Sequence, residues 1–233
     1  MSRAEEFIDL YKQLEDAAVQ RYGYPTDGRA VSRLEDRREF ARISGELSYC
    51  REVRNLLQHK PKVRGEFMVE PSREMLQLLR ETLDKVKHPV RCRDLCIPFQ
   101  KMYWKTMEDP VLPSIRQLRT AGHTHIPLLE NRRVVGMFTV NGLFSYLAAH
   151  GAEGLTEATR FSHMRDELCM DCHPSEIYVF APMNAAADEV EEHFRQAEQQ
   201  GRRVGMVILT ETGKPTEKVQ GILTAWDLVG HSL

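Results

Sequence analysis

Two short stretches of the sequence bring together side chains that can act on phosphates or sugars. The first, "RNLLQH" (Arg54–His59), pairs an arginine with a histidine five positions later. A guanidinium offers a forked set of donors that suits a phosphate, and a histidine exchanges protons near neutral pH. Residues 51–64 carry five basic residues against one acidic residue, a local charge of +4. This stretch is therefore a candidate for acid–base chemistry on a phosphate.

The second stretch, "GILTAWD" (Gly221–Asp227), places a threonine at the end of an expected strand and an aspartate on the first turn of an expected helix. Thr224 and Asp227 then present a hydroxyl and a carboxylate together, and free backbone N–H groups at a helix start favour an anion. A carboxylate that accepts from both hydroxyls of a ribose gains charge-assisted hydrogen bonds. The alternative is that the two residues only cap the helix and complement its dipole.

Helices are expected to position the first stretch. Apolar residues at helical spacing predict one helix that ends at the turn 23–28, and a second that runs from a Ser32 cap to about His59, before Pro61. Arg54 falls in the apolar stripe of the second helix. Because a buried charge needs a partner or a wet cavity, Arg54 is expected either to pair with an acid across a bundle or to face a dimer cleft.

A third helix is expected after a Ser72 cap, with His88 at its end. Beyond it the pattern changes to short apolar strands and to helices closed by glycine. The expected strands are 125–130, 133–139, 176–181, 203–209 and 218–224, and the expected helices are 114–121, 140–150, 185–200 and 225–230.

This second part of the chain is a tandem repeat. Gly136 and Thr139 of "GMFT" match Gly221 and Thr224 of "GILT", and "RDLC" before the first copy echoes "RDELC" before the second. The sequence therefore predicts an α+β fold, in which an all-α helical bundle precedes a pair of β-α-β-β-α units. The predicted boundaries are 1–88 for the helical domain, 89–151 for the first unit and 152–233 for the second.

The repeat resembles cystathionine-β-synthase (CBS) domains, which pair into a Bateman module. The resemblance spans roughly residues 90–231 and depends most on "GILTAWD". It implies that an adenosine-containing nucleotide such as AMP, ADP or ATP is the regulatory ligand. Thr224 would contact phosphate or ribose, Asp227 would accept from the ribose hydroxyls, and Gly221 belongs to the same signature.

The first copy departs from this signature. It keeps Thr139 but has Asn141 and Gly142 where an acid or a serine is expected. One stronger nucleotide site and one weaker, altered or empty site are therefore expected. The base is expected to lie against strand residues of the repeat, with Tyr178 and Val179 as candidates, and the alternative is that both belong only to the core.

The helical domain resembles HEPN domains (higher eukaryotes and prokaryotes nucleotide-binding), because "RNLLQH" fits their Arg-x4–6-His signature with a polar residue after the arginine. Many such domains are metal-independent ribonucleases that act as dimers. The resemblance implies that Arg54 binds phosphate, that Asn55 belongs to the catalytic motif and that His59 is the general acid or base, with RNA as substrate and a homodimer as the active form. The alternative is a non-catalytic signalling or adaptor protein whose helical domain dimerises or docks on a partner.

Composition narrows the remaining possibilities. The net charge of −2 gives no reason to expect non-specific nucleic-acid binding by the whole chain. No apolar run approaches the about 20 residues that cross a bilayer, and the acidic, amphipathic N-terminal stretch is unlike a signal peptide. Five cysteines, an odd number, do not indicate a secreted disulfide scaffold. We therefore expect a cytoplasmic protein without membrane contact.

Four of the cysteines leave a zinc site open as an alternative. Cys92 and Cys96 precede the first copy, and Cys169 and Cys172 precede the second, so that four thiolates could meet. The Cys-x3-Cys spacing is unusual for zinc, however, so buried inert thiols and no metal are expected. The histidines of "GHTHIP" are also expected to be structural, namely His123 and His125.

Overall fold

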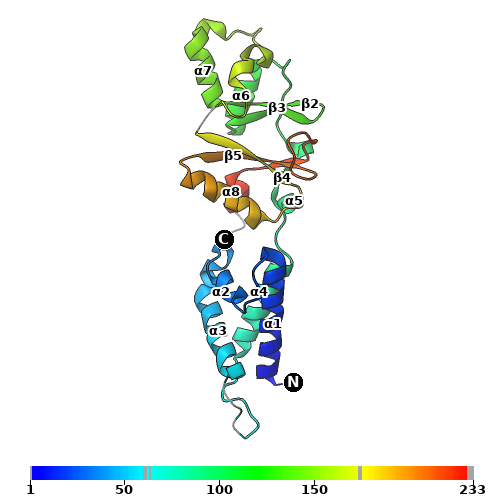
Figure 1. Cartoon of the computed structure of the whole chain (residues 1–233). Coiled ribbons are helices and arrows are strands. Elements are labelled where there is room, and N and C mark those ends of the chain that lie inside the picture. The colour runs from blue at the N-terminus through cyan, green and yellow to red at the C-terminus, as the bar shows by residue number, and fades with distance from the viewer. Residues whose placement is uncertain (1, 60–61, 63, 173–174, 230–233) are drawn as a thin grey trace. The chain divides into compact units, whose positions relative to one another are not determined.

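The computed structural model describes residues 2–59, 62, 64–172 and 175–229. It divides into two units, Met1–Val90 and Arg91–Leu233, called here the helical unit and the repeat unit. Figure 1 shows the elements of each unit. The expectation that Pro61 ends a helix lies outside the described residues.

The helical unit consists of helices joined by short turns. Its elements are α1 (Arg3–Tyr22), α2 (Ala30–Glu35), the 3₁₀-helix η1 (Arg38–Ile43), α3 (Ser44–His59) and α4 (Arg73–Lys87). α1 packs against α4 and α2 packs against α3. Side chains from all of these elements fill one apolar core, in which Phe7, Leu47 and Leu79 are fully buried.

The first and third predicted helices are confirmed. α1 begins after Ser2, whose side chain caps the first turn, and ends at Gly23 in the left-handed conformation with φ of 66°. α4 begins after Ser72, whose hydroxyl accepts a hydrogen bond from the Met75 amide at 3.2 Å, and ends at Lys87. Both helices therefore start at the cap residue that their sequence provides.

The predicted continuous helix from Ser32 to His59 is wrong. Ser32 lies inside α2, and the chain leaves helical geometry at Arg37, which is extended with φ of −86° and ψ of 138°. The break allows α2 to pack against α3 and places Phe40 in the core with 1% of its surface exposed. Apolar residues continue at helical spacing across the break, so the periodicity alone did not show it.

The repeat unit alternates strands and helices along the chain. Its first part contains α5 (Cys92–Leu95), β1 (Ile97–Pro98), η2 (Phe99–Lys101), α6 (Val111–Ala121), β2 (His125–Glu130), β3 (Arg133–Thr139), α7 (Val140–His150) and η3 (Ala152–Gly154). Its second part contains η4 (Phe161–Glu167), β4 (Glu176–Pro182), α8 (Ala187–Gln199), β5 (Arg203–Thr210), β6 (Gly221–Leu223) and α9 (Ala225–Val229). One sheet has the order β1-β6-β5-β4 and the other is the hairpin β2-β3. β4 and β5 are parallel, and the other neighbouring strands are antiparallel.

The predicted hairpin 125–130 and 133–139 is confirmed, and its turn residues Asn131 and Arg132 have positive φ. The predicted strand 218–224 is shorter than expected. Val219 pairs with the turn of the hairpin instead, since its amide donates to the Arg132 carbonyl at 2.8 Å and its carbonyl accepts from the Arg132 guanidinium at 2.9 Å. These bonds attach the second copy to the first.

The first strand of the first copy is also much reduced. Only an isolated parallel bridge between Lys105 and Leu128 takes its place, whereas β4 and β5 pair along their full length in the second copy. The two copies therefore share an order of elements but not the length of every strand.

The segment that enters each copy pairs with the other copy. β1 precedes the first copy and pairs with β6 of the second. Leu168 precedes the second copy, and its carbonyl accepts from the amide of Met137 in β3 of the first at 2.8 Å. Glycine makes both approaches possible, because a Cβ on Gly221 would lie 2.9 Å from the Ile97 carbonyl and one on Gly136 would lie 3.0 Å from the Leu168 carbonyl.

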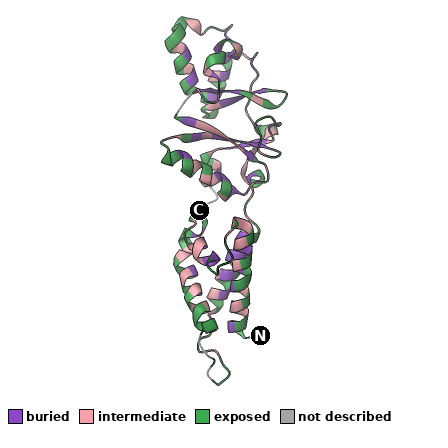
Figure 2. Ribbon diagram, viewed as in Figure 1, coloured by how far each residue is buried: buried purple, intermediate pink, exposed green. Residues whose placement is uncertain are grey.

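Three apolar clusters hold the repeat unit together, and buried residues follow its strands in Figure 2. One cluster lies between the hairpin and the helices of the first copy, and a second between the four-stranded sheet and α8 and α9. The third joins side chains of both sheets, among them Met137, Leu129, Met206, Ile208 and Ile222, and is called here the inter-sheet core.

The predicted α+β fold class is confirmed, with a helical region of α1–α4 followed by a mixed region of strands and helices. Within the described residues, no helix is long and apolar enough to cross a membrane.

Candidate functional site

Thr224 and Asp227 meet at the start of α9, as their spacing predicted. One carboxylate oxygen of Asp227, Oδ2, accepts from the Thr224 amide at 2.7 Å and from the Thr224 hydroxyl at 2.8 Å. These two bonds are those of a helix cap, the alternative role that the sequence left open for Thr224 and Asp227. Both bonds use the same oxygen, however, so they leave Oδ1 able to accept from another donor.

The equivalent position in the first copy is arranged differently. Thr139 caps α7 by accepting from the Gly142 amide at 2.9 Å, and 2% of its surface is exposed. Gly142 stands where the second copy has Asp227, and Asn141 beside it is exposed. The first copy therefore offers a buried, engaged hydroxyl and no carboxylate.

Gly221, the first residue of the "GILTAWD" signature, has a packing role. A Cβ at this position would lie 2.9 Å from the Ile97 carbonyl and 3.1 Å from the Cys96 sulfur. Asp227 is also close enough to Cys96 for its charge to contribute to the raised pKa of that thiol, although burial is the larger cause. The segment that enters β1 is therefore the neighbour of the Thr224–Asp227 pair. The motif "RDLC" (Arg93–Cys96) precedes the first copy as "RDELC" (Arg165–Cys169) precedes the second. This repetition is the sequence signal that could have indicated the segment as a neighbour of the site.

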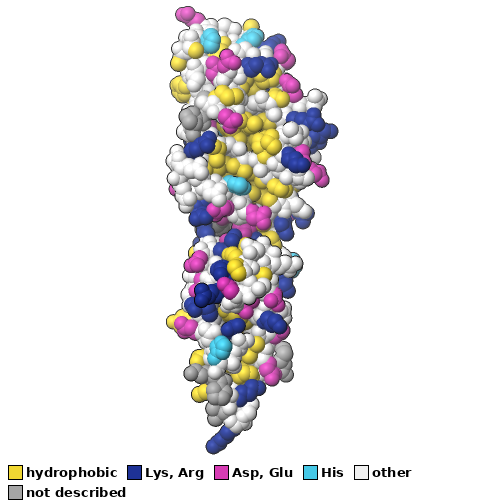
Figure 3. All heavy atoms as spheres, viewed as in Figure 1, with side chains coloured by type: hydrophobic (Ala, Val, Ile, Leu, Met, Phe, Trp, Pro, Cys, Tyr) yellow, Lys and Arg dark blue, Asp and Glu magenta, His cyan; other side chains and the backbone are white. Residues whose placement is uncertain are grey.

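Tyr178 and Val179, the candidates for contact with a base, lie on opposite faces of β4. Tyr178 packs at the margin of the inter-sheet core, and Val179 packs against the core that contains α8. β4 and β6 are separated by β5, so about 10 Å lies between them at ~4.8 Å per strand pair. The structure does not bring either residue next to Asp227. Figure 3 shows hydrophobic side chains gathered over β3, β4 and β5 on the visible face of the repeat unit.

A buried carboxylate that the sequence did not indicate joins the two copies. Glu176, at the start of β4, accepts from the Arg203 guanidinium at 2.8 Å and from the Tyr178 hydroxyl at 2.9 Å. Its Oε1 lies 3.1 Å from Nε2 of His125 at the start of β2. A Cβ on Gly205 would lie 2.9 Å from the carboxyl carbon, so glycine there makes room for it.

Glu176 is ionised in this setting, although it is buried with only 1% of its surface exposed to solvent. Burial raises the pKa of the carboxyl group, but the contacts with His125, Tyr178 and Arg203 outweigh burial and lower its pKa to about 2. The Glu176 carboxylate accepts hydrogen bonds from Tyr178 and Arg203, whereas Nε2 of His125 is buried and makes no hydrogen bond with the described residues. The cluster therefore combines an ion pair within the second copy, between Glu176 and Arg203, with a close contact to His125 of the first copy.

Arg54 of the helical unit pairs with an acid across the bundle, one of the two outcomes expected for it. Its guanidinium lies 3.8 Å from the Glu15 carboxylate on α1 and 5.7 Å from the Tyr11 ring centre. Nε of Arg54 and Oε1 of Glu15 are buried and have no hydrogen-bond partner among the residues that the structure describes. Burial raises the pKa of Glu15, and the attraction of Arg54 offsets this only in part. The position of Glu15, one turn after Tyr11 in α1, could have suggested it as the partner.

Asn55 and His59 are exposed on α3. The Arg54 guanidinium donates to the Asn55 side chain at 3.3 Å. Within the described part of the chain, no hydrogen bond or ion pair joins Arg54 to His59. The three residues of the "RNLLQH" motif are therefore not assembled into one site within a single chain.

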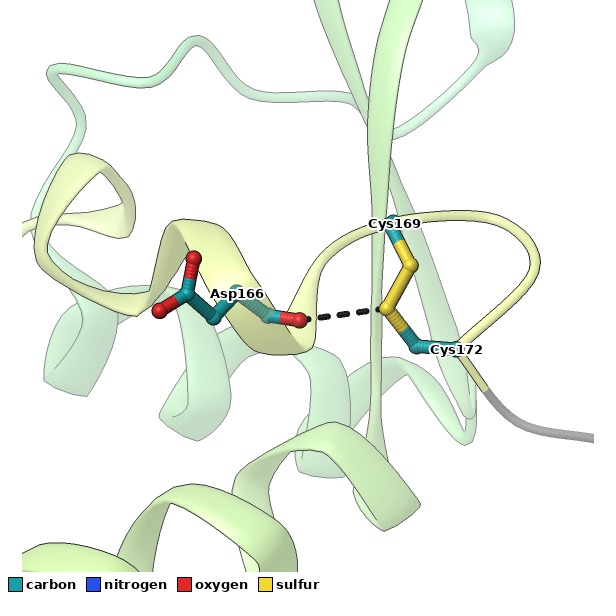
Figure 4. Close-up of a disulfide and its surroundings, with 3 residues drawn as sticks. All are labelled: Asp166, Cys169 and Cys172. Atoms are coloured by element: carbon teal, nitrogen blue, oxygen red, sulfur yellow. Dashed lines mark hydrogen bonds between the residues drawn. A yellow bond between two sulfur atoms is a disulfide. The ribbon is translucent and has the colours of Figure 1, made fainter.

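The cysteines divide into two groups. Cys169 and Cys172 form a disulfide (Figure 4), while Cys50 and Cys92 are buried thiols and Cys96 is a half-buried thiol. The expectation of buried inert thiols is therefore wrong for Cys169 and Cys172. Their disulfide also leaves no set of four thiolates for zinc. Among the described residues, no group of three or more histidine, cysteine or acidic side chains is placed to hold a metal ion.

A shallow depression of about 930 Å³ lies on the helical unit beside α1 and α4. Its lining mixes acidic and basic side chains, and Arg80 there is paired with Glu6. It contains none of the predicted site residues.

Comparisons with known proteins give fold similarities only. No protein-family model matches the chain, and no curated protein matches it. The CBS-domain containing protein ATU1752 from Agrobacterium tumefaciens is 17% identical, with 62% of this chain and 100% of that chain covered and a TM-score of 0.42.

Two further similar structures are recorded with adenosine compounds. The CBS domain pair of protein MJ0100, in complex with 5-methylthioadenosine and S-adenosyl-L-methionine, is 12% identical, with 61% of this chain and 94% of that chain covered and a TM-score of 0.41. CbpB in complex with c-di-AMP is 11% identical, with 66% of this chain and 90% of that chain covered and a TM-score of 0.48.

Proposed function

We propose that the repeat unit binds an adenine nucleotide and that this binding regulates the helical unit. The observation that supports the proposal most is the Thr224–Asp227 pair, which fixes a carboxylate at the end of β6 and leaves Oδ1 for a ligand. The CBS resemblance of "GILTAWD" supplies the class of ligand. The first copy, with Gly142 in place of the acid, is proposed to be the weaker or empty site.

Each residue of the pair has a distinct part in the proposed site. Oδ1 of Asp227 would accept from a ribose hydroxyl, a charge-assisted bond that a neutral residue cannot supply. The Thr224 hydroxyl donates to Asp227 and keeps its lone pairs available, so a second sugar hydroxyl could donate to it. The Asp227 charge acts on the Cys96 thiol, and Ile97 pairs with Ile222 of β6. We propose that the segment entering β1 forms the adjacent wall of the site.

Equilibrium dialysis of the whole chain tests nucleotide binding. The panel contains AMP, ADP and ATP, and also 5′-methylthioadenosine, S-adenosylmethionine and c-di-AMP, the compounds recorded with two similar structures. Free ribose 5-phosphate serves as the control that lacks the base. Saturable binding of at least one adenine compound is expected, and absence of binding across the panel would reject the proposal.

A second candidate function is metal-independent RNA cleavage by the helical unit. The exposure of Asn55 and His59 favours it, because both side chains are available to RNA or to a partner copy. The Arg54–Glu15 pair favours the alternative, a helical unit that only dimerises or docks on a partner, since Arg54 already faces an acidic side chain of its own chain.

RNA cleavage in EDTA separates these two functions of the helical unit. A ribonuclease would lose activity in His59→Ala and keep it in Gln58→Ala, a matched change at the exposed neighbouring position. If the parent protein does not cleave, or if both variants cleave equally, His59 has no catalytic role. The homodimer and the cytoplasmic location stay predictions.

A further inference from the structure

The segment between the two copies carries a pair of cysteines at Cys-x-x-Cys spacing. Cys169 and Cys172 form a disulfide with their Cα atoms 5.4 Å apart, within the usual range for such a bond. Leu168, directly before the pair, bonds to Met137 of the first copy, and β4 of the second copy begins shortly after it, at Glu176. The disulfide therefore lies where the chain passes from one copy to the other.

The loop closed by the disulfide also contributes to the core of the repeat unit. It contains Met170 and Asp171, and Met170 packs against the inter-sheet core that both copies build. A bond between Cys169 and Cys172 restricts the backbone on either side of Met170.

Exposure distinguishes Cys169 from the three free thiols, because Cys50 and Cys92 are buried and Cys96 is half-buried. Cys169 is exposed and Cys172 is half-buried. Burial raises the pKa of Cys50 to about 11 and that of Cys92 to about 12, and it also raises the pKa of Cys96. Because the thiolate is the reactive form, these three thiols stay protonated and inert near neutral pH.

The first copy provides an internal comparison. Cys96 in "RDLC" corresponds to Cys169 in "RDELC", but the residue three positions after Cys96 is Phe99. Cys96 is accordingly a free thiol, and the disulfide occurs only before the second copy.

The surroundings of Cys172 accommodate the reduced form as well. Its sulfur lies 3.1 Å from the carbonyl oxygen of Asp166, as Figure 4 shows. A thiol at this position can donate to that carbonyl. Opening the disulfide therefore leaves Cys172 with a hydrogen-bond partner.

We propose that Cys169 and Cys172 are a reversible thiol–disulfide site, and that closing the disulfide holds Met170 in the inter-sheet core. The co-reactant is a low-molecular-weight disulfide such as glutathione disulfide. The exposed Cys169 thiolate attacks one sulfur, expels one thiolate and forms a mixed disulfide. Cys172, after losing its proton to solvent, then attacks the Cys169 sulfur and expels the second thiolate. Both expelled thiolates are protonated, so that two thiols form for each protein disulfide, and excess thiol reverses both steps.

Alkylation in glutathione buffers tests whether the site is reversible. The whole chain is equilibrated at a series of ratios of reduced to oxidised glutathione, quenched in acid, alkylated after unfolding and analysed by peptide mass spectrometry. Labels on Cys169 and Cys172 are expected to disappear together as the oxidised form increases and to return when the ratio is reversed. Labels on Cys50, Cys92 and Cys96 are expected to persist throughout.

Two outcomes would overturn the reversible site. One is that Cys169 and Cys172 keep or lack their labels at every ratio, which would make them permanent thiols or a permanent disulfide. The other is a stable glutathione adduct on either residue instead of the internal bond.

Hydrogen exchange tests the effect on the inter-sheet core. The Met137 amide, which donates to Leu168, is the reporter, and its exchange is expected to be about tenfold slower in the oxidised than in the reduced parent. Cys172→Ser should exchange at the reduced rate under all conditions, while Cys96→Ser, the matched change in the first copy, should keep the difference. The reduced parent supplies the same comparison if Cys172→Ser does not fold. Equal exchange in both redox states of the parent would contradict the link to the core.

Discussion

Two carboxylates of the repeat unit occupy contrasting positions, and the contrast indicates their roles. Glu176 is fully enclosed and shares its two oxygens among three partners from β2, β4 and β5. Asp227 uses one oxygen for both of its bonds to Thr224. A carboxylate whose acceptors are all occupied stabilises the fold, whereas one with an unused oxygen can still bind a ligand. The contrast assigns a structural role to Glu176, and it supports our proposal that Asp227 binds a ligand.

The first prediction concerns the pH dependence that Glu176 confers. Its pKa falls from 4.5 to about 2 on folding, so its ionised form stabilises the folded repeat unit by about 3 kcal/mol at most. A lowered carboxyl pKa gives stability that is complete above about pH 5 and is lost as the pH falls toward 2. Glu176→Gln should therefore be much less stable than the parent at pH 7, and the difference should shrink by about half at pH 3.

Tryptophan fluorescence during urea unfolding of the whole chain measures this difference. Both tryptophans, Trp104 and Trp226, belong to the repeat unit, so the signal reports that unit. Glu130→Gln, an exposed change at the end of β2, is the control and should match the parent. A difference between parent and Glu176→Gln that stays constant from pH 7 to pH 3 would refute the ionic role of Glu176.

The second prediction concerns Arg54 and Glu15. The raised pKa of Glu15 means that burial disfavours its charge more than Arg54 favours it. The folded state favours the protonated form of Glu15, so the stability that this carboxyl group contributes is present at low pH and is lost as the pH rises. The neutral Glu15→Gln should therefore be no less stable than the parent at pH 7. Arg54→Met removes the cation that faces this buried carboxylate and should cost about 1–3 kcal/mol.

Far-ultraviolet circular dichroism during thermal unfolding measures both variants, since α1, α3 and α4 of the helical unit are the longest helices among the described residues. Gln58→Met, an exposed change on α3, controls for the new methionine. We expect the loss of Arg54 to be costly and the neutralisation of Glu15 to be harmless. This expectation would be contradicted if Arg54→Met were as stable as the parent, or if Glu15→Gln were strongly destabilised.

At the scale of elements, the segment that enters each copy pairs with the other copy, and this arrangement is called here the crosswise pairing. It depends on two glycines. Gly136 and Gly221 occupy matching positions in β3 and β6, and each lies against the backbone that enters the other copy. The closeness is a property of the pairing and not of turn geometry, because neither glycine has a positive φ. Any side chain at these positions must move the paired segment away.

The third prediction follows from this contact. Gly221→Ala should destabilise the repeat unit by about 1–3 kcal/mol, because its methyl group would lie 2.9 Å from a backbone oxygen. Gly136→Ala should have a similar or slightly smaller effect, at 3.0 Å. Urea unfolding followed by tryptophan fluorescence checks both.

Gly45 provides the control for these glycine substitutions. It lies in α3, and a Cβ there would meet no atom within 4 Å, so Gly45→Ala should be neutral or stabilise the helical unit by up to about 1 kcal/mol. The crosswise pairing would lose its support if Gly221→Ala and Gly136→Ala were also neutral.

The same elements show which parts of the fold the sequence predicted. The hairpin of β2 and β3 followed from apolar strand residues around Asn131, the end of α1 from the turn 23–28, and the start of α4 from its Ser72 cap. These are local signals. The break before α3 was missed because Phe40 and its packing partners are distant in sequence, so no local pattern records it.

The candidate site shows the same division. The closeness of Thr224 and Asp227 followed from their spacing, because a strand end and the first helical turn lie within one hydrogen bond of each other. The cluster of Glu176, His125 and Arg203 comes from three separate strands, and only the tertiary structure brings them together. The disulfide was missed because the cysteines were expected to be packed, whereas Cys169 is exposed.

At the scale of the whole molecule, the proposal requires that a ligand on the repeat unit changes the behaviour of the helical unit. A ligand can do this only if it has different affinities for two states of the protein. Such coupling is typically 1–3 kcal/mol, equivalent to a change of about 5- to 150-fold in an equilibrium constant. The homodimer implied by the HEPN resemblance offers an equilibrium on which this change can be measured.

The fourth prediction is therefore a ligand-dependent shift in self-association. Sedimentation equilibrium of the whole chain, with and without the best ligand from the dialysis panel, should show the dimer constant change by at least about fivefold. Asp227→Ala at the same ligand concentration should show a smaller shift. A bound ligand that leaves the constant unchanged would leave the repeat unit as a binding module without this regulatory role.

The fifth prediction compares the two copies directly. Asp227→Ala removes a charge-assisted acceptor, a loss of roughly 1.5–3 kcal/mol for each hydrogen bond, so binding should weaken about tenfold or more. Asn141→Ala changes the exposed polar residue of the first copy, where Gly142 replaces the acid, and should weaken binding by much less. The two substitutions thus change corresponding regions of the two copies, and only Asp227→Ala is expected to weaken binding strongly.

Titration calorimetry of the parent, Asp227→Ala and Asn141→Ala with the same adenine nucleotide is the most direct test of the central claim. Urea unfolding of each variant first establishes that the repeat unit is intact. The account predicts one dominant site in the parent, at least tenfold weaker binding in Asp227→Ala and near-parent binding in Asn141→Ala. Parent-like affinity in a folded Asp227→Ala would contradict the claim that this carboxylate binds the nucleotide.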